Sequence, residues 1–242
     1  MNRGAKTTRH AAADLVAELR ALGDEDARAG MARYGINVER ACGVSVKTLR
    51  TMAKRIGTDH ELALALWATA QHEARLLACF VDDPTAVTAA QAEDWVRGVD
   101  SWDLCDQMAT SLMDQTVHAW PKARAWARRS EPWAKRAGFA LMAGLAVHDK
   151  VASDRGFIAL LPLIERGAFD ERNFVRKAVN WALRNVGKRN AALHTAALDA
   201  AQRILAAADA RAGGPRGGDA SVRSARWVAR DAIRELASRK PR

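Results

Sequence analysis

Residues 99–106 read Val-Asp-Ser-Trp-Asp-Leu-Cys-Asp, and this stretch predicts the start of a helix. Asp100 or Ser101 can cap the first turn, because a side-chain oxygen at that position accepts a hydrogen bond from a free backbone N–H group. Trp102 and Asp106 are four residues apart, so they share one face of the helix. An aromatic ring and a carboxylate on one face indicate a candidate site, if the chain also supplies a concave surface lined by cations.

Helical patterns continue on both sides of this stretch. Runs of alternating Val, Ile and Thr, which would favour strands, are missing. Apolar spacing and capping residues predict helices over 10–22, 24–34, 45–56, 59–69, 73–81, from 88, 102–113, 115–127, from 132, 154–165, 171–186, 191–210 and 221–238. Pro121 is expected to kink or split its helix.

The number and spacing of these helices predict an all-α fold. Helix pairs recur at roughly 35 to 45 residues, the scale of HEAT-like repeats. Stacked pairs form a curved solenoid with a concave face, on which distant segments meet. We therefore expect one helical-repeat domain over 1–242, with a Gly-rich flexible loop at about 211–220 before a basic C-terminal helix. A compact bundle or globin-like packing is the alternative.

Positive charge is concentrated toward the end of the chain. Residues 171–242 hold 16 Lys and Arg against 6 Asp and Glu, a balance of +10 that equals the net charge of the whole chain. Residues 1–170 are therefore neutral. A basic surface of this size attracts polyanions, and nucleic acid comes first among them. General solubility is the alternative explanation of the charge.

Other features exclude several classes of protein. Cys42, Cys79 and Cys105 are widely spaced and form no Cys-x-x-Cys or Cys/His cluster, so no disulfide framework and no metal site is expected. Residues 1–10 are basic and polar, without an apolar signal core. No uncharged apolar stretch reaches the length of about 18 residues that a membrane span needs. We expect a cytoplasmic protein without a membrane partner.

Several stretches together resemble the AlkD-like DNA alkylation repair family of HEAT-like repeat DNA glycosylases. They follow the family order from about residue 30 to 188, and the Trp-Asp-x-x-Asp and Arg-Lys-Ala-x-x-Trp-Ala-Leu-Arg pieces are the most specific. The stretches are Tyr34, Cys42-Gly43-Val44, Leu49-Arg50, His72-Glu73-Ala74-Arg75, Trp95, Ser101-Trp102-Asp103-Leu104-Cys105-Asp106, Trp133-Ala134-Lys135-Arg136 and residues 174–184.

The resemblance implies a curved fold whose concave basic groove holds double-stranded DNA. It also implies excision of cationic alkylpurines, such as N3-methyladenine and N7-methylguanine, by a monomeric and monofunctional glycosylase that uses no metal and no other cofactor. The catalytic carboxylate of the family falls on Asp106, its aromatic neighbours on Trp102 and Trp181, and its site arginine on Arg136. A family tyrosine falls on Tyr34. Bound to DNA, such a protein would be associated with the nucleoid.

The chemistry of such a site is electrostatic. Alkylation at these nitrogens makes the base a cationic leaving group, so the C1′–N bond breaks through an oxocarbenium-like state that a carboxylate stabilises. A nearby arginine helps to keep Asp106 ionised, and the faces of Trp102 and Trp181 attract a cation. The alternative is a structural ion pair of Asp106 with Arg136 or Arg176, with both tryptophans in the core.

Cations beyond this group are expected to bind phosphates. Contacts of this kind give affinity and position without reading sequence. The candidates are Lys135, Arg176, Lys177, Arg184, Lys188 and Arg189, with Tyr34 as a further DNA contact implied by the resemblance. A solvated rim charge is the alternative for Lys135 and Arg136.

The sequence therefore predicts a DNA-3-methyladenine and 7-methylguanine glycosylase acting in base excision repair. A non-catalytic binder of DNA structures on the same scaffold is one alternative, although a binder has no need of a carboxylate in an anion-binding groove. A HEAT-type scaffold for protein interactions is another, and it predicts no salt-dependent DNA binding. The segment after Asn190 matches nothing with confidence and is expected to be a specific addition.

Overall fold

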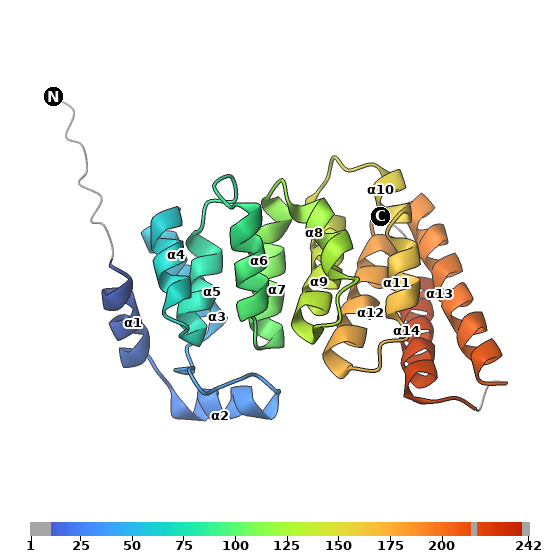
Figure 1. The fold of residues 1–242 in the computed structure, drawn as a ribbon, viewed down its shortest axis with the longest axis horizontal. Helices are drawn as coiled ribbons and strands as arrows, with labels where there is room; N and C mark the ends of the chain where they lie inside the picture. Colours follow the sequence, from blue (N-terminus) through green and yellow to red (C-terminus); the bar gives the residue numbers. More distant parts are fainter. Residues whose placement is uncertain (1–10, 214–216, 239–242) are drawn as a thin grey trace. The chain divides into compact units, whose positions relative to one another are not determined.

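The computed structural model describes residues 11–213 and 217–238. Within these residues the regular structure is helical, without a strand (Figure 1). Contacts between residues group the chain into two compact units, Met1–Val87 and Thr88–Arg242. The predicted single domain over 1–242 stays a prediction. Of the predicted Gly-rich loop, residues 214–216 lie outside the described part, as does the basic stretch 1–10.

The helix boundaries follow the sequence pattern closely. In the first unit the helices are α1 (Ala12–Ala21), α2 (Glu25–Arg33), α3 (Val46–Ile56), α4 (His60–Ala68) and α5 (His72–Val81). In the second unit they are α6 (Ala89–Gly98), α7 (Trp102–Ser111), the 3₁₀ turn η1 (Met113–Gln115), α8 (Ala119–Trp126), α9 (Pro132–His148), α10 (Asp154–Ile158), α11 (Leu161–Gly167), α12 (Asn173–Gly187), α13 (Ala191–Arg211) and α14 (Ala220–Ala237).

Side-chain caps explain why many of these helices begin where they do. The side chains of Asp24, Ser45, Asp59, Thr88 and Asn190 each accept a hydrogen bond from the backbone N–H three residues later, over 2.8 to 3.1 Å. Each bond satisfies one of the four N–H groups that a helix start leaves without a partner.

Two predictions about proline-containing helices were wrong. Pro121 neither kinks nor splits a helix, because α8 begins at Ala119 and Pro121 lies in its first turn, where no N–H donor is needed. The predicted helix over 154–165 is two helices, α10 and α11. Pro162 has no N–H to donate to the carbonyl of Ile158, and its ring would collide with that carbonyl, so the first helix ends there.

Helix α9 is the core of the second unit. Its residues from Ala137 to Leu145 are at most 1% exposed where they are apolar, so the helix is apolar all round, as a buried helix is. It packs against α6, α7, α8 and α12. A Cβ atom at Gly138 would lie 2.3 Å from the backbone nitrogen of Ala127, so only glycine lets the end of α8 approach this closely. Figure 1 shows the helices of this unit lying side by side.

A carboxylate network joins α6 to α8. Glu93 accepts hydrogen bonds from Lys122 Nζ, from Trp126 Nε1 (3.0 Å) and from an Nη atom of Arg129. Its side chain is 24% exposed. Burial alone would raise the pKa of Glu93, but the three donors outweigh it and lower the pKa to about 2. The ionised carboxylate is therefore part of the folded structure.

A second carboxylate organises the first unit. The side chain of Glu73 is fully buried on α5 and accepts hydrogen bonds from the backbone N–H groups of Cys42 (2.9 Å), Gly43 (2.8 Å) and Val44 (3.3 Å). Gly43 has a φ of +86°, and a Cβ atom there would lie 2.1 Å from the carbonyl oxygen of Asp24. The Cys-Gly-Val stretch therefore forms a backbone cradle for this carboxylate.

No helix of the described residues is both long enough and apolar enough to span a membrane.

Glu93→Gln is expected to lower the free energy of unfolding at pH 7 by roughly 2 to 3 kcal/mol, because a carboxylate whose pKa falls from about 4.3 to about 2 on folding stabilises the ionised fold. That contribution is present above pH 4.3 and is lost as the pH falls toward 2, so the variant should lose less stability on acidification. Urea unfolding between pH 7 and pH 3 measures both. Equal pH profiles for Glu93→Gln and for the exposed control Glu171→Gln would contradict this role.

Glu73→Ala is expected to expose the cradle, because three buried N–H groups would lose their acceptor at about 1 to 3 kcal/mol each. Hydrogen exchange of the peptide that contains residues 42–44 should accelerate strongly, as followed by mass spectrometry. Glu61→Ala, at an exposed position of α4, is the matched control and should leave that exchange unchanged. Unchanged protection in Glu73→Ala would show that the cradle does not depend on the carboxylate.

Candidate functional site

The stretch that carries Trp102 and Asp106 is the first half of α7. Ser101 is its N-cap residue, as the sequence suggests, but its hydroxyl does not accept from the backbone. It donates instead to Asp103 Oδ1 over 2.7 Å. The prediction that the Ser101 side chain caps the helix was therefore wrong, and capping by Asp100 stays a prediction. Trp102 opens the helix, and Asp106 follows one turn later on the same face.

Asp106 is held by a two-pronged ion pair with Arg136 of α9. Nε of Arg136 donates to Oδ1 over 2.9 Å, and Nη2 donates to Oδ2 over 2.7 Å. The remaining Nη1 donates to the backbone carbonyl of Phe174 on α12. One guanidinium group thus fixes three helices of the second unit, because its planar donors match the carboxylate and the carbonyl at once.

This pair is buried, but not sealed. The Arg136 side chain is 7% exposed, whereas 17% of the Asp106 side chain remains accessible. Burial raises the pKa of Asp106, and the charge and hydrogen bonds of Arg136 oppose that rise. A carboxylate has about four lone-pair directions, of which Arg136 uses two. Asp106 can therefore present a negative edge to a group outside the pair.

One aromatic pair joins α9 to α12, and two further tryptophans lie on α7 and α12. The rings of Trp133 and Phe174 are 5.2 Å apart between centroids. Trp102 and Trp181 are both half-buried, in contrast to Trp126, which is fully buried. Trp181 lies seven residues after Phe174 on α12, which places the two on one face. The alternative prediction had two parts. Asp106 does form an ion pair with Arg136, as that alternative expects, but Trp102 and Trp181 are only half-buried and not fully in the core.

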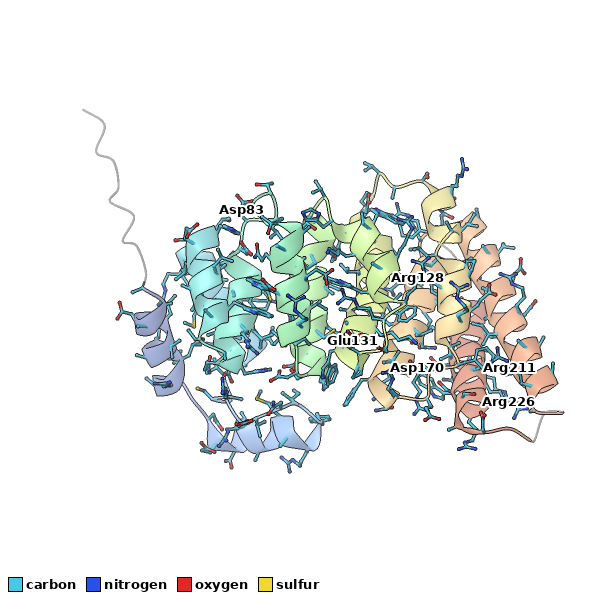
Figure 2. The ribbon with its side chains drawn as sticks, viewed as in Figure 1. Asp83, Arg128, Glu131, Asp170, Arg211 and Arg226 are labelled. Atoms are coloured by element: carbon cyan, nitrogen blue, oxygen red, sulfur yellow. The ribbon has the colours of Figure 1, made fainter. Side chains whose placement is uncertain are left out.

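Lys135, the expected phosphate ligand next to Arg136, has an acidic partner. Its Nζ lies 2.8 Å from Asp170 Oδ2, and Arg172 contacts both oxygens of the same carboxylate, at 2.8 and 2.6 Å. Burial would raise the pKa of Asp170, but the Arg172 and Lys135 donors lower it to about 2. Asp170 is labelled in Figure 2, just before α12. Asp170 was not among the predicted site residues, since an acidic residue between two helices carries no signal in the sequence that it will meet Lys135.

Two further expected DNA ligands, one on α12 and one at its C-cap, form salt bridges to α14. Arg184 and Lys188 both contact the carboxylate of Glu235, and Arg184 also lies 3.7 Å from Asp231. The sequence shows these cations as one basic run, but the fold places acidic residues of the last helix beside them.

Arg176 and Lys177 differ from these two. Arg176 lies over the ring of Trp227 of α14, 5.0 Å from its centroid, and donates to Asn173 Oδ1 over 3.2 Å. Lys177 is exposed. Unlike Arg184 and Lys188, neither Arg176 nor Lys177 has a carboxylate among the contacts described.

Arg189 ends the run in a structural position. It donates to the backbone carbonyls of Ala146 (3.2 Å) and Ala152 (3.1 Å), and its guanidinium lies 4.6 Å from the ring centroid of Phe157.

Tyr34 lies in the first unit, directly after α2, and is 76% exposed. The structure therefore joins Asp106, Arg136, Lys135 and α12 in one unit. The expected DNA contacts stay predictions.

The described residues contain no group of three or more His, Cys, Asp or Glu side chains arranged to hold a metal ion.

Arg136→Ala is expected to lower the free energy of unfolding by about 3 to 5 kcal/mol, because the substitution leaves a buried carboxylate without its cation. The double variant Arg136→Ala with Asp106→Asn should recover part of this loss, since the uncompensated charge is gone. Urea unfolding at pH 7 gives the double-mutant cycle. Arg136→Lys should fall between wild type and Arg136→Ala, since lysine keeps the charge but not the fork. Strict additivity of the two changes would argue against the pair.

Similarity to known proteins shows the fold and the family of this chain. No curated protein matches the chain in sequence. A solved structure described as "a new family of proteins related to the HEAT-like repeat DNA glycosylases with affinity for branched DNA structures" has a TM-score of 0.72 and 23% identity, and the match covers 80% of this chain and 83% of that one. The fold is therefore the HEAT-like repeat fold. The family model for DNA alkylation repair enzymes matches residues 15–236, so the chain belongs to the DNA alkylation repair enzyme family.

Proposed function

We propose that this protein is a DNA glycosylase that removes positively charged alkylated purines, such as N3-methyladenine and N7-methylguanine, from double-stranded DNA. The observation that carries the proposal is the two-pronged ion pair of Asp106 and Arg136, which joins α7 to α9. The half-buried Trp102 lies one turn before Asp106 on the same helix face, and the half-buried Trp181 lies on α12, the helix whose Phe174 carbonyl Arg136 also contacts. Membership of the alkylation repair family supports the choice of substrate class.

Asp106 is the catalytic carboxylate in this proposal. Breaking the C1′–N bond leaves the electron pair on the departing base, whose positive charge is thereby neutralised, and builds positive charge on the sugar. The accessible edge of Asp106 stabilises that developing cation. A water molecule then adds to the sugar and gives up its proton, so the products are the free base and an abasic site.

Arg136 acts as the positioning residue. Its third N–H bond, to the carbonyl of Phe174, fixes the guanidinium plane, which in turn fixes the plane of the carboxylate. Preorganised charge of this kind costs little rearrangement at the moment of reaction. Trp102 and Trp181 offer aromatic faces to a cationic base or sugar, at about 0.5 to 2 kcal/mol each.

Phosphate binding is assigned within a basic groove. Lys177 and Arg176 are the stronger candidates, because no carboxylate contact is described for either. The other four cations already have partners, so each would bind a phosphate by sharing or giving up a contact with a carboxylate or a backbone carbonyl. They are Lys135, Arg184, Lys188 and Arg189. Tyr34 is proposed to contact DNA from the first unit. The protein is proposed to act as a monomer in the cytoplasm, without a metal or other cofactor.

A second candidate function is non-catalytic binding of DNA structures. One observation favours it: both oxygens of Asp106 are already engaged by Arg136, so the pair has no net charge toward DNA. The structural neighbour, at 23% identity, is described as having affinity for branched DNA. Base release separates this function from the first, because a pure binder releases none.

Asp106→Asn is expected to reduce release of N7-methylguanine and N3-methyladenine from methylated duplex DNA by about 100- to 1000-fold, since it removes the charge that stabilises the sugar cation and keeps the side-chain shape. The measurement is chromatography of the free bases at fixed times. Affinity for unmodified duplex should change little.

Asp103→Asn is the matched control, because Asp103 lies in the same turn of the same helix and differs in being bonded to Ser101. It should retain most of the activity. Release by neither wild type nor variant, with DNA still bound, would leave the binder as the function. Equal release by wild type and Asp106→Asn would mean that another group supplies the charge.

A further inference from the structure

The exposed face of α14 carries a stripe that the proposed reaction does not use. Arg223, Trp227, Arg230 and Arg234 are spaced by four, three and four residues, which places them on one face of the helix, and all four are exposed. The stripe covers eleven residue steps, or roughly 16 Å along the helix. It borders a surface hollow of about 400 Å³.

Trp227 is the unusual member of this stripe. It is 38% exposed, whereas tryptophan is highly buried on average in folded proteins. Arg176 of α12 lies over the ring at 5.0 Å, which holds the indole in place from the adjacent helix. A fixed, partly open aromatic surface among cations is the arrangement on which unpaired bases stack.

The other charged residues of the hollow are already paired. Arg226, labelled in Figure 2, donates to Asp209 Oδ1 over 2.8 Å and to the carbonyl of Gly217. Asp231, the one carboxylate lining the hollow, is contacted by Arg234 and lies 3.7 Å from Arg184. The negative charge of Asp231 is therefore compensated. The face keeps a positive balance through Arg230 and through Arg223, which donates to the backbone carbonyl of Gly218 over 3.2 Å and keeps its charge uncompensated by that bond.

We propose that this α14 stripe binds a short single-stranded segment of DNA, with one unpaired base stacked on Trp227 and adjacent phosphates held by Arg223 and Arg230. This inference rests on the DNA-binding part of the proposed function and does not depend on base excision. A duplex buries its base faces, so it can use the arginines of the stripe but not the indole face.

The length of the stripe agrees with such a ligand. A span of roughly 16 Å accommodates a few nucleotides, at the lower end of the site sizes of single-strand binding surfaces. The two arginines lie on either side of Trp227, four residues before it and three after it. Phosphates that flank a stacked base therefore find a cation on each side.

The test measures binding of the full chain to fluorescein-labelled, unmodified DNA by anisotropy at two salt concentrations. One probe is a blunt 20-base-pair duplex, and the other is the same duplex with a single-stranded tail of eight thymidines. Wild type is expected to bind the tailed probe more tightly. Trp227→Ala should weaken binding to the tailed probe by about 5- to 100-fold and binding to the blunt probe by less than 2-fold, and Trp227→Phe should restore most of the loss.

Arg230→Gln should weaken binding and reduce its salt dependence, whereas the matched control Arg166→Gln, at an exposed arginine of α11, should not change the preference for the tail. Thermal unfolding checks that each variant is folded. Equal binding of both probes by wild type, or equal weakening of both by Trp227→Ala, would overturn the inference and leave the proposed function intact. Failure to bind either probe would contradict both, and binding of the tailed probe alone supports the stripe without the duplex groove.

Discussion

The second unit depends on the hydrogen bonds that the buried guanidinium of Arg136 donates to two neighbouring helices. It reaches Asp106 of α7 through two donors and the carbonyl of Phe174 on α12 through a third, so one side chain sets the positions of three helices. An arginine side chain 7% exposed is tolerated in an apolar core only when its donors are satisfied. The same contacts that make the charge tolerable also hold a carboxylate in one orientation with one edge accessible. Structure and proposed chemistry therefore use the same atoms.

Pairing also determines which of the many cations are available to a polyanion. The excess of positive charge in residues 171–242 suggests a continuous basic surface. In the fold, Glu235 forms salt bridges with Arg184 and Lys188, and Asp170 forms salt bridges with Lys135 and Arg172. The Glu235 salt bridges order α14 against the C-terminal end of α12, and the Asp170 salt bridges order the start of α12 against α9. The positive potential that remains belongs to residues such as Lys177 and the exposed arginines of α14, which a count of charges cannot single out.

Both units use carboxylates to fix backbone or helix positions, with Glu73 fully buried and Glu93 partly exposed. Glu73 holds the N–H groups of the stretch before α3, and Glu93 holds α8 against α6. These glutamates contribute to folding and not to a site, although Glu73 lies inside a stretch by which the chain resembles its family. A motif residue can thus owe its place to a backbone cradle.

The amino-acid sequence is enough to predict the helical class, most helix boundaries and the shared helix face of Trp102 and Asp106. These follow from local rules: apolar spacing, capping side chains, and the geometry of one turn. The effects of Pro121 in α8 and Pro162 in α11 are harder to predict from the sequence. A proline is tolerated in the first turn of a helix but breaks a helix interior, and the sequence does not fix where each helix begins. The choice of Arg136 as partner of Asp106 came from family resemblance, and spacing along the chain left Arg176 equally open. Only the tertiary structure decided that choice, together with the acidic partners of Lys135, Arg184 and Lys188 and the exposure of Trp227. These depend on contacts between residues 30 to 51 positions apart, and sequence periodicity carries no information about which side chains meet over such separations.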